Sequence, residues 1–123
     1  MPSTSAYDTR QAENYFANKL AFTTGPVEVS QQIENGDDLT IIDVRDEKDF
    51  RKGHVPGAIN LPESQWGTYR GLSKDQPNIV YCYSQTCHLG AKAAHHFARA
   101  GYEVLEMDGG FTAWQENKLE VDK

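Results

Sequence analysis

The chain has 123 residues, of which 38% are hydrophobic and 24% charged, which is the composition of one globular domain. Its 12 Lys and Arg against 18 Asp and Glu give a net charge of −6, which argues against nucleic-acid binding because phosphate backbones attract clustered cations. No apolar run reaches the roughly 20 residues of a membrane span, and no secretory signal opens the sequence, so we expect a cytoplasmic protein with no membrane partner. Two cysteines, Cys82 and Cys87, are too few for a disulfide framework.

The N-terminal part is predicted to hold one helix that stands apart from the rest. Residues 1–7 are expected to be disordered. An amphipathic helix is predicted over 8–20, because apolar side chains recur there at intervals of three and four, and Asp8 is a suitable N-cap. This extra helix could cover a surface or form a dimer contact, and the sequence does not choose between them or give an oligomeric state.

Short helices and short strands alternate along the remaining chain. The residue patterns predict helices at about 26–34, 62–69 and 88–100, and around 113–114. They predict strands at 39–44, 58–61, 78–82 and 103–107. Alternation of this kind is typical of a mostly parallel α/β sheet with helices on both faces. Functional sites in such sheets form at the carboxyl ends of the strands.

Cys82 ends one of these strands, and a helix begins a few residues later. A helix N-terminus presents free N–H groups and a partial positive charge, so we expect the pKa of Cys82 to be lowered. A loop wrapped around the sulfur would also direct N–H groups at an anion. A thiolate in such a cradle suits sulfur or phosphoryl transfer.

Three blocks of sequence closely resemble the signatures of the rhodanese family. The first is 43–50 together with 53–60, the second is 79–82 together with 90–94, and the third is 108–111 with Trp114. They follow the family's order and spacing over about 26–118, and the short chain is similar to the small, single-domain, phage-shock-type members. The resemblance implies a three-layer α/β fold over 21–123, with a five-stranded parallel sheet flanked by helices.

The resemblance also implies a reaction. The loop cysteine takes the outer sulfur of a donor such as thiosulfate or a persulfide, carries it as a cysteine persulfide, and passes it to cyanide or a thiol. No metal or organic cofactor is implied. Cys82 matches the nucleophile, and His88 at the helix start is a candidate to contact an anionic substrate. The matching anion cradle is formed by Tyr83, Ser84, Gln85 and Thr86.

The loop departs from the family pattern in two ways. The usual Arg five residues after the nucleophile is replaced by Cys87, and no Lys or Arg occurs from 83 to 91. Because Arg is a strong ligand for oxyanions, we expect a small-molecule persulfide, a polysulfide or a protein persulfide to be a better donor than thiosulfate. The loop is also about two residues longer than usual. This extra length could bring Cys87 to the centre of the cradle instead. Cys82 is the favoured nucleophile because it directly follows the strand, while resolving, structural and nucleophilic roles stay open for Cys87.

Other motif residues are expected to be structural. Arg45, which follows Asp43, is predicted to pair with Glu47 or Asp49 and so to fix the loop after the strand. His54, next to Gly53, is predicted to be a hydrogen-bonded turn histidine. Turns with positive φ are predicted at Gly57, Gly109 and Gly110.

Several other functions compete with sulfur transfer. A phosphatase of similar fold would need an Arg six residues after the nucleophile, and that position is His88 or Ala93. A zinc site lacks a fourth local ligand. Two alternatives stay open, namely a thiol–disulfide redox protein that uses Cys82 and Cys87, and a non-catalytic rhodanese-like binding or regulatory module.

Overall fold

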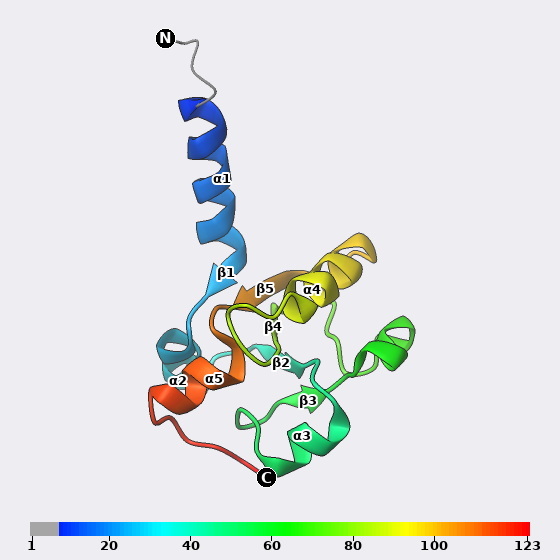
Figure 1. The fold of residues 1–123 in the computed structure, drawn as a ribbon. Coiled ribbons are helices and arrows are strands. Elements are labelled where there is room, and N and C mark those ends of the chain that lie inside the picture. The colour runs from blue at the N-terminus through cyan, green and yellow to red at the C-terminus, as the bar shows by residue number, and fades with distance from the viewer. Residues whose placement is uncertain (1–7) are drawn as a thin grey trace.

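The computed structural model describes residues 8–123, and Figure 1 shows their arrangement. The expectation of disorder for 1–7 lies outside the described residues. Five strands form one parallel sheet in the order β1-β5-β4-β2-β3, so the predicted fold class is confirmed. The strands are β1 (Thr23–Thr24), β2 (Thr40–Asp43), β3 (Ile59–Asn60), β4 (Asn78–Tyr81) and β5 (Val104–Met107).

Helices occur where the sequence predicts them, with one addition. Their bounds are α1 (Thr9–Phe22), α2 (Pro26–Asn35), α3 (Glu47–Lys52), the 3-10 helix η1 (Glu63–Thr68), α4 (Leu89–Arg99) and α5 (Gly110–Glu116). The predicted cap of α1 is present, since the Asp8 carboxylate accepts from the N–H groups of Arg10 and Gln11. Helix α3 was missed because six residues with one apolar side chain show no helical period. None of the helices within 8–123 is long and apolar enough to cross a bilayer.

Alternate residues of the central strands supply the two layers of the core. Ile41 and Ile79 pack on the face that α2 and α5 cover, whereas Ile42 and Val80 pack on the opposite face with α4 and η1. β1 was also missed, since two threonines cannot show an alternating pattern. It pairs with β5 at the edge of the sheet and leads out of α1.

Candidate active site

The loop between β4 and α4 carries both cysteines at the carboxyl end of the central strand. Backbone N–H groups at the start of α5 hold its first residues, because Phe111 donates to the carbonyl oxygen of Cys82 and Thr112 to that of Tyr83, each at 2.9 Å. The Gly109 N–H donates to the side-chain oxygen of Gln85 at 2.6 Å. The first N–H groups of α5, which have no partner within the helix, therefore fix the shape of the loop.

Gly110 allows this close approach. Its φ is +58°, and a Cβ placed there would lie 2.7 Å from the Cys82 carbonyl oxygen and 2.8 Å from the Ser84 nitrogen. The predicted positive φ is also present at Gly57 and Gly109, both at 81°. Gly109 therefore allows the turn before α5, and Gly110 allows the backbone of α5 to contact the backbone of the loop directly.

Cys82 is almost completely buried, with 2% of its surface exposed. It packs in the apolar layer beneath α4 with Val80, Ala93 and Phe97. Its thiol donates to the carbonyl oxygen of Cys87, with an Sγ–O distance of 3.4 Å. Burial in this layer, and then the hydrogen bond to the Cys87 side chain, raise the pKa of Cys82 to about 11.

Cys87 is the more accessible thiol of the two. Burial opposes ionisation of this group too, but hydrogen bonds outweigh that effect and lower its pKa. The donors are the Cys82 side chain and the backbone N–H groups of Tyr83, Leu89 and Gly90. Two of these N–H groups belong to the first turn of α4, so the helix N-terminus stabilises a thiolate at position 87.

The expectation that Cys82 has the lowered pKa is therefore wrong. The loop places a second cysteine just before α4, and the N–H groups of Leu89 and Gly90 lower the pKa of that cysteine. Cys82 lies below the helix start rather than in front of it. The backbone N–H groups of Gly90 and Ser84 lower the pKa of Cys82, but the effect of burial is larger and raises it.

The four residues expected to form the cradle, and His88 after them, have different roles in the structure. The backbone N–H of Tyr83 faces the Cys87 sulfur, while its hydroxyl points away and donates to Asp49. The hydroxyls of Ser84 and Thr86 lie 3.3 Å apart. Gln85 fixes the loop to Gly109. His88 is exposed at the N-cap position of α4.

Sequence reasoning missed Glu106, which lies on β5 beside the loop. A Cβ placed on Gly90 would lie 3.1 Å from a Glu106 carboxyl oxygen and 3.3 Å from the Cys82 sulfur, so both groups face the same glycine. Burial and the neighbouring Asp108 raise the pKa of Glu106, although the charges of Lys19 and His88 oppose the shift. An acidic residue inside the apolar segment Val104–Met107 was the available signal.

A buried ion pair supports the site from the β2 side. Asp43 is fully buried and Arg45 is 4% exposed, and their side chains approach to 2.8 Å. The Tyr81 hydroxyl donates to the same carboxylate at 2.6 Å, and the Arg45 guanidinium donates to the Gly53 carbonyl at 2.7 Å. The guanidinium also lies 4.2 Å from the centre of the Phe111 ring. Every buried charge in this cluster is thus paired.

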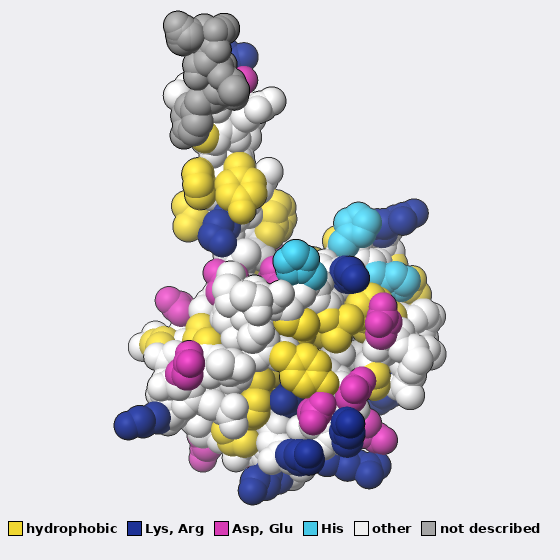
Figure 2. All heavy atoms as spheres, in the orientation of Figure 1, with side chains coloured by type: hydrophobic (Ala, Val, Ile, Leu, Met, Phe, Trp, Pro, Cys, Tyr) yellow, Lys and Arg dark blue, Asp and Glu magenta, His cyan; other side chains and the backbone are white. Residues whose placement is uncertain are grey.

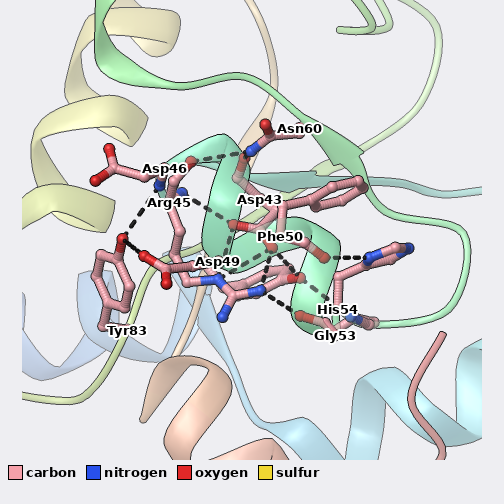
Figure 3. A network of polar contacts seen from close by, with 11 residues as sticks. Asp43, Arg45, Asp46, Asp49, Phe50, Gly53, His54, Asn60 and Tyr83 are labelled. Carbon is pink, nitrogen blue, oxygen red and sulfur yellow. Dashed lines mark hydrogen bonds and ion pairs between the residues drawn. The ribbon is translucent and has the colours of Figure 1, made fainter. Parts of the chain in front are cut away.

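This arrangement corrects the expected partners of Arg45, as Figure 3 shows. The guanidinium pairs with Asp43 rather than with Glu47 or Asp49. Two of its nitrogens donate to the buried Asp43 carboxylate, so it does not need a carboxylate at the surface. Asp49 instead accepts the hydroxyl of Tyr83 at 2.6 Å, and that hydroxyl accepts the Asp46 N–H at 3.1 Å. Helix α3, which the sequence did not predict, therefore anchors a side chain of the cysteine loop.

His54 stands in the turn after α3. Its Nδ1 is 2.8 Å from the carbonyl oxygen of Phe50, and its ring stacks on the Phe50 ring with centroids 3.8 Å apart. Its backbone exchanges hydrogen bonds with Asp122 near the C-terminus. The neighbouring Asn60 side chain donates to the carbonyl oxygens of Asp43 and Arg45. These contacts stabilise the turn on the side of the sheet next to the ion pair.

The fold and the loop together define an α/β protein with a thiol site at the carboxyl edge of its sheet. Residues 25–117 match the family described as Rhodanese-like domain, and the chain belongs to that family. The resemblance drawn from the sequence motifs is confirmed.

Individual proteins agree with this assignment. The chain is 34% identical over 93 residues to Thiosulfate sulfurtransferase GlpE of Pseudoalteromonas translucida, covering 72% of this chain and 87% of that protein. It is 32% identical over 87 residues to HTH-type transcriptional regulator Rv0324 of Mycobacterium tuberculosis. That match covers 70% of this chain but only 38% of the regulator's length. The crystal structure of BH2092 protein from Bacillus halodurans superposes with a TM-score of 0.84 at 31% identity, covering 94% of this chain and 86% of that one. The family and its sulfurtransferase members support an activity of the sulfurtransferase kind.

Proposed function

We propose that this protein is a sulfurtransferase that carries sulfane sulfur as a persulfide on Cys87. The observation that supports this most directly is the position of Cys87, which is the more accessible thiol and lies just before the first turn of α4, whereas Cys82 is only 2% exposed. A thiolate is the nucleophilic form of cysteine, and an accessible thiolate with aligned N–H groups is equipped to attack sulfur. Cys82, which the motif alignment favours, lies buried beneath α4 and donates to the Cys87 carbonyl oxygen.

The proposed cycle has two displacements. The Cys87 thiolate attacks the outer sulfur of a donor persulfide, the donor's S–S bond breaks, and the donor leaves as a thiolate that takes up a proton. The new Cys87 persulfide anion is held by the same N–H groups. An acceptor thiolate or cyanide then attacks the outer sulfur, which restores the Cys87 thiolate. No electrons are gained or lost overall, so the cycle needs no cofactor.

A thiol persulfide, a polysulfide or a protein persulfide is the proposed donor. Thiosulfate carries two negative charges, and the loop from 83 to 91 offers no Lys or Arg to bind them. Arg45 is occupied by Asp43, and Glu106 with Asp108 adds negative charge beside the loop. The name of the GlpE relative makes thiosulfate the competing donor. The proposed location is the cytoplasm, where thiol donors and acceptors are kept reduced.

Mass spectrometry of the intact protein tests the proposal. The wild type, Cys82→Ser and Cys87→Ser would each be treated with thiosulfate, glutathione persulfide and inorganic polysulfide, and the gain of a sulfur atom measured. We expect the wild type and Cys82→Ser to gain sulfur from the last two donors, and Cys87→Ser to gain none. Sulfur on Cys87→Ser but not on Cys82→Ser would make Cys82 the carrier. No sulfur on the wild type would favour a binding module.

The contact between the two thiols supports a second candidate, a persulfide reductase. Cys82 would attack the Cys87 persulfide at the inner sulfur, which forms a Cys82–Cys87 disulfide and releases hydrosulfide. An external dithiol would then have to reduce the disulfide. This route is favoured if the treated wild type releases hydrosulfide and becomes resistant to alkylation, whereas Cys82→Ser keeps its persulfide.

A further inference from the structure

Helix α1 carries an apolar face that the other described residues, 23–123, leave uncovered. None of its 14 residues is buried. The exposed fractions are 60% for Tyr15, 56% for Phe16, 82% for Leu20 and 58% for Phe22. Figure 1 shows the helix projecting from the body, and Figure 2 shows apolar side chains gathered on its lower half. Helices this short are marginal alone in water, so packing on this face has to stabilise α1.

A groove lies at the base of this helix, with a cavity volume of about 630 Å³. Tyr15 and Phe22 of α1 line one wall. The opposite wall is α4, where Ala91, Ala94 and Ala98 present small side chains, and β5 forms the floor. Small residues on one wall and large rings on the other leave room for large apolar side chains that come from outside the chain.

Charge on the helix complements charge in the groove. Helix α1 carries two cations, Arg10 and Lys19, against one carboxylate, within a chain of net charge −6. The groove is lined by three carboxylates, those of Glu103, Glu106 and Asp108, against one cation of its own chain, Lys19, so an excess of negative charge is left to meet a second helix. A helix with the composition of α1 therefore suits this groove in both apolar character and sign of charge.

We propose that α1 is the contact of a homodimer, in which α1 of each copy lies in the groove of the other. One chain presents both the helix and a groove that suits it, so two copies can exchange helices reciprocally about a two-fold axis and form a closed pair. Each large aromatic ring can bury roughly 150–250 Å². The three rings and Leu20 are each more than half exposed, and their free surface with the groove walls they meet supplies a large part of the roughly 800 Å² per partner of a stable complex.

The dimer would place the partner's helix beside the cysteine loop. Gln85 of the loop and Glu106, which faces the same glycine as Cys82, both line this groove. The partner helix would thus close one side of the entrance to the thiols. This inference concerns assembly and holds whether or not the chain transfers sulfur.

Light scattering on the size-exclusion column, at micromolar concentration, tests the dimer. We expect the full wild-type chain to have the mass of two copies rather than 13.8 kDa, and its Tm to rise with protein concentration. Leu20→Glu on the helix face and Ala94→Glu on the groove wall should each shift the mass to one copy. Val27→Glu is the matched control, because Val27 is an exposed apolar residue of α2 outside this surface, 42% exposed, and should remain dimeric.

A monomeric wild type would overturn the proposal and leave the groove to a different occupant. A dimer that persists in both Leu20→Glu and Ala94→Glu would also overturn it, because another surface would then hold the copies together. Far-UV circular dichroism shows that each variant is folded. If one of them does not fold, the other decides.

Discussion

The Cys82 thiol donates to the carbonyl oxygen of Cys87 across 3.4 Å, and its nearness to the Cys87 side chain lowers the pKa of Cys87. The pKa of the buried thiol is raised and that of the accessible thiol is lowered, so Cys87 ionises before Cys82. The two pKa values differ because of burial, since a thiolate at position 82 would form inside an apolar layer of the core.

Removing the donor at position 82 should make Cys87 less reactive. Cys82→Ala deletes the side-chain hydrogen bond to the thiolate, so the apparent pKa of Cys87 should rise and its alkylation near neutral pH should slow. Cys82→Ser is the matched control, since a hydroxyl can still donate. The pH dependence of the rate with iodoacetamide measures both. Identical profiles for Cys82→Ala and wild type would contradict the proposed pair.

Breaking the buried ion pair should cost far more stability than breaking a surface pair. Arg45→Met leaves the Asp43 carboxylate buried without a partner, and the expected loss is about 3–5 kcal/mol. Arg51→Met is the control, because Arg51 meets Glu47 at 3.3 Å with both side chains largely exposed, and such pairs contribute roughly 0–1 kcal/mol. Urea unfolding measures both. Equal losses would show that Asp43 is not dependent on Arg45.

Adding one methyl group at Gly110 should impair the loop rather than only the turn. The new Cβ would approach the Cys82 carbonyl oxygen to 2.7 Å, so Gly110→Ala should displace the loop and reduce persulfide formation. Gly36→Ala is the control. It also has a positive φ, of 74°, but no atom within 4 Å, so it should cost only about 1–2 kcal/mol of backbone strain and keep full activity. Full activity in Gly110→Ala would refute the contact.

The Glu106 carboxyl should make stability depend on pH. Its pKa is raised by burial and by Asp108, so the folded chain binds this proton more tightly than the unfolded chain. The resulting stabilisation is complete below the unfolded value and is lost as the pH rises through the folded value. Glu106→Gln should therefore have a higher Tm than wild type at neutral pH, and the difference should vanish at about pH 4.

Thermal unfolding across this pH range measures the effect. Glu103→Gln provides the control, since Glu103 begins the same segment with its side chain exposed to water and should follow the wild type. A Glu106→Gln variant that is no more stable than wild type at neutral pH would mean that the carboxyl is adequately solvated in the folded chain.

Much of the fold follows from local patterns. The strands at 40–43 and 78–81 are apolar and β-branched enough to be recognised alone, and the glycines after 108 already indicate a turn. Helix α3 and strand β1 were not predictable, because six and two residues carry too little periodicity. Tertiary contacts form them, through Phe50 in the core and through the pairing of Thr23 with Glu106.

The sequence by itself determined the fold class, the family and the loop that holds the two cysteines, because these depend on the order and spacing of motifs along the chain. Only the tertiary structure decided how the thiols differ. Burial beneath α4, the direction of N–H groups and the nearness of Glu106 all depend on segments far apart in sequence. The burial of a sulfur atom and the electrostatic potential around it are set by packing, so the order of residues along the chain does not reveal them.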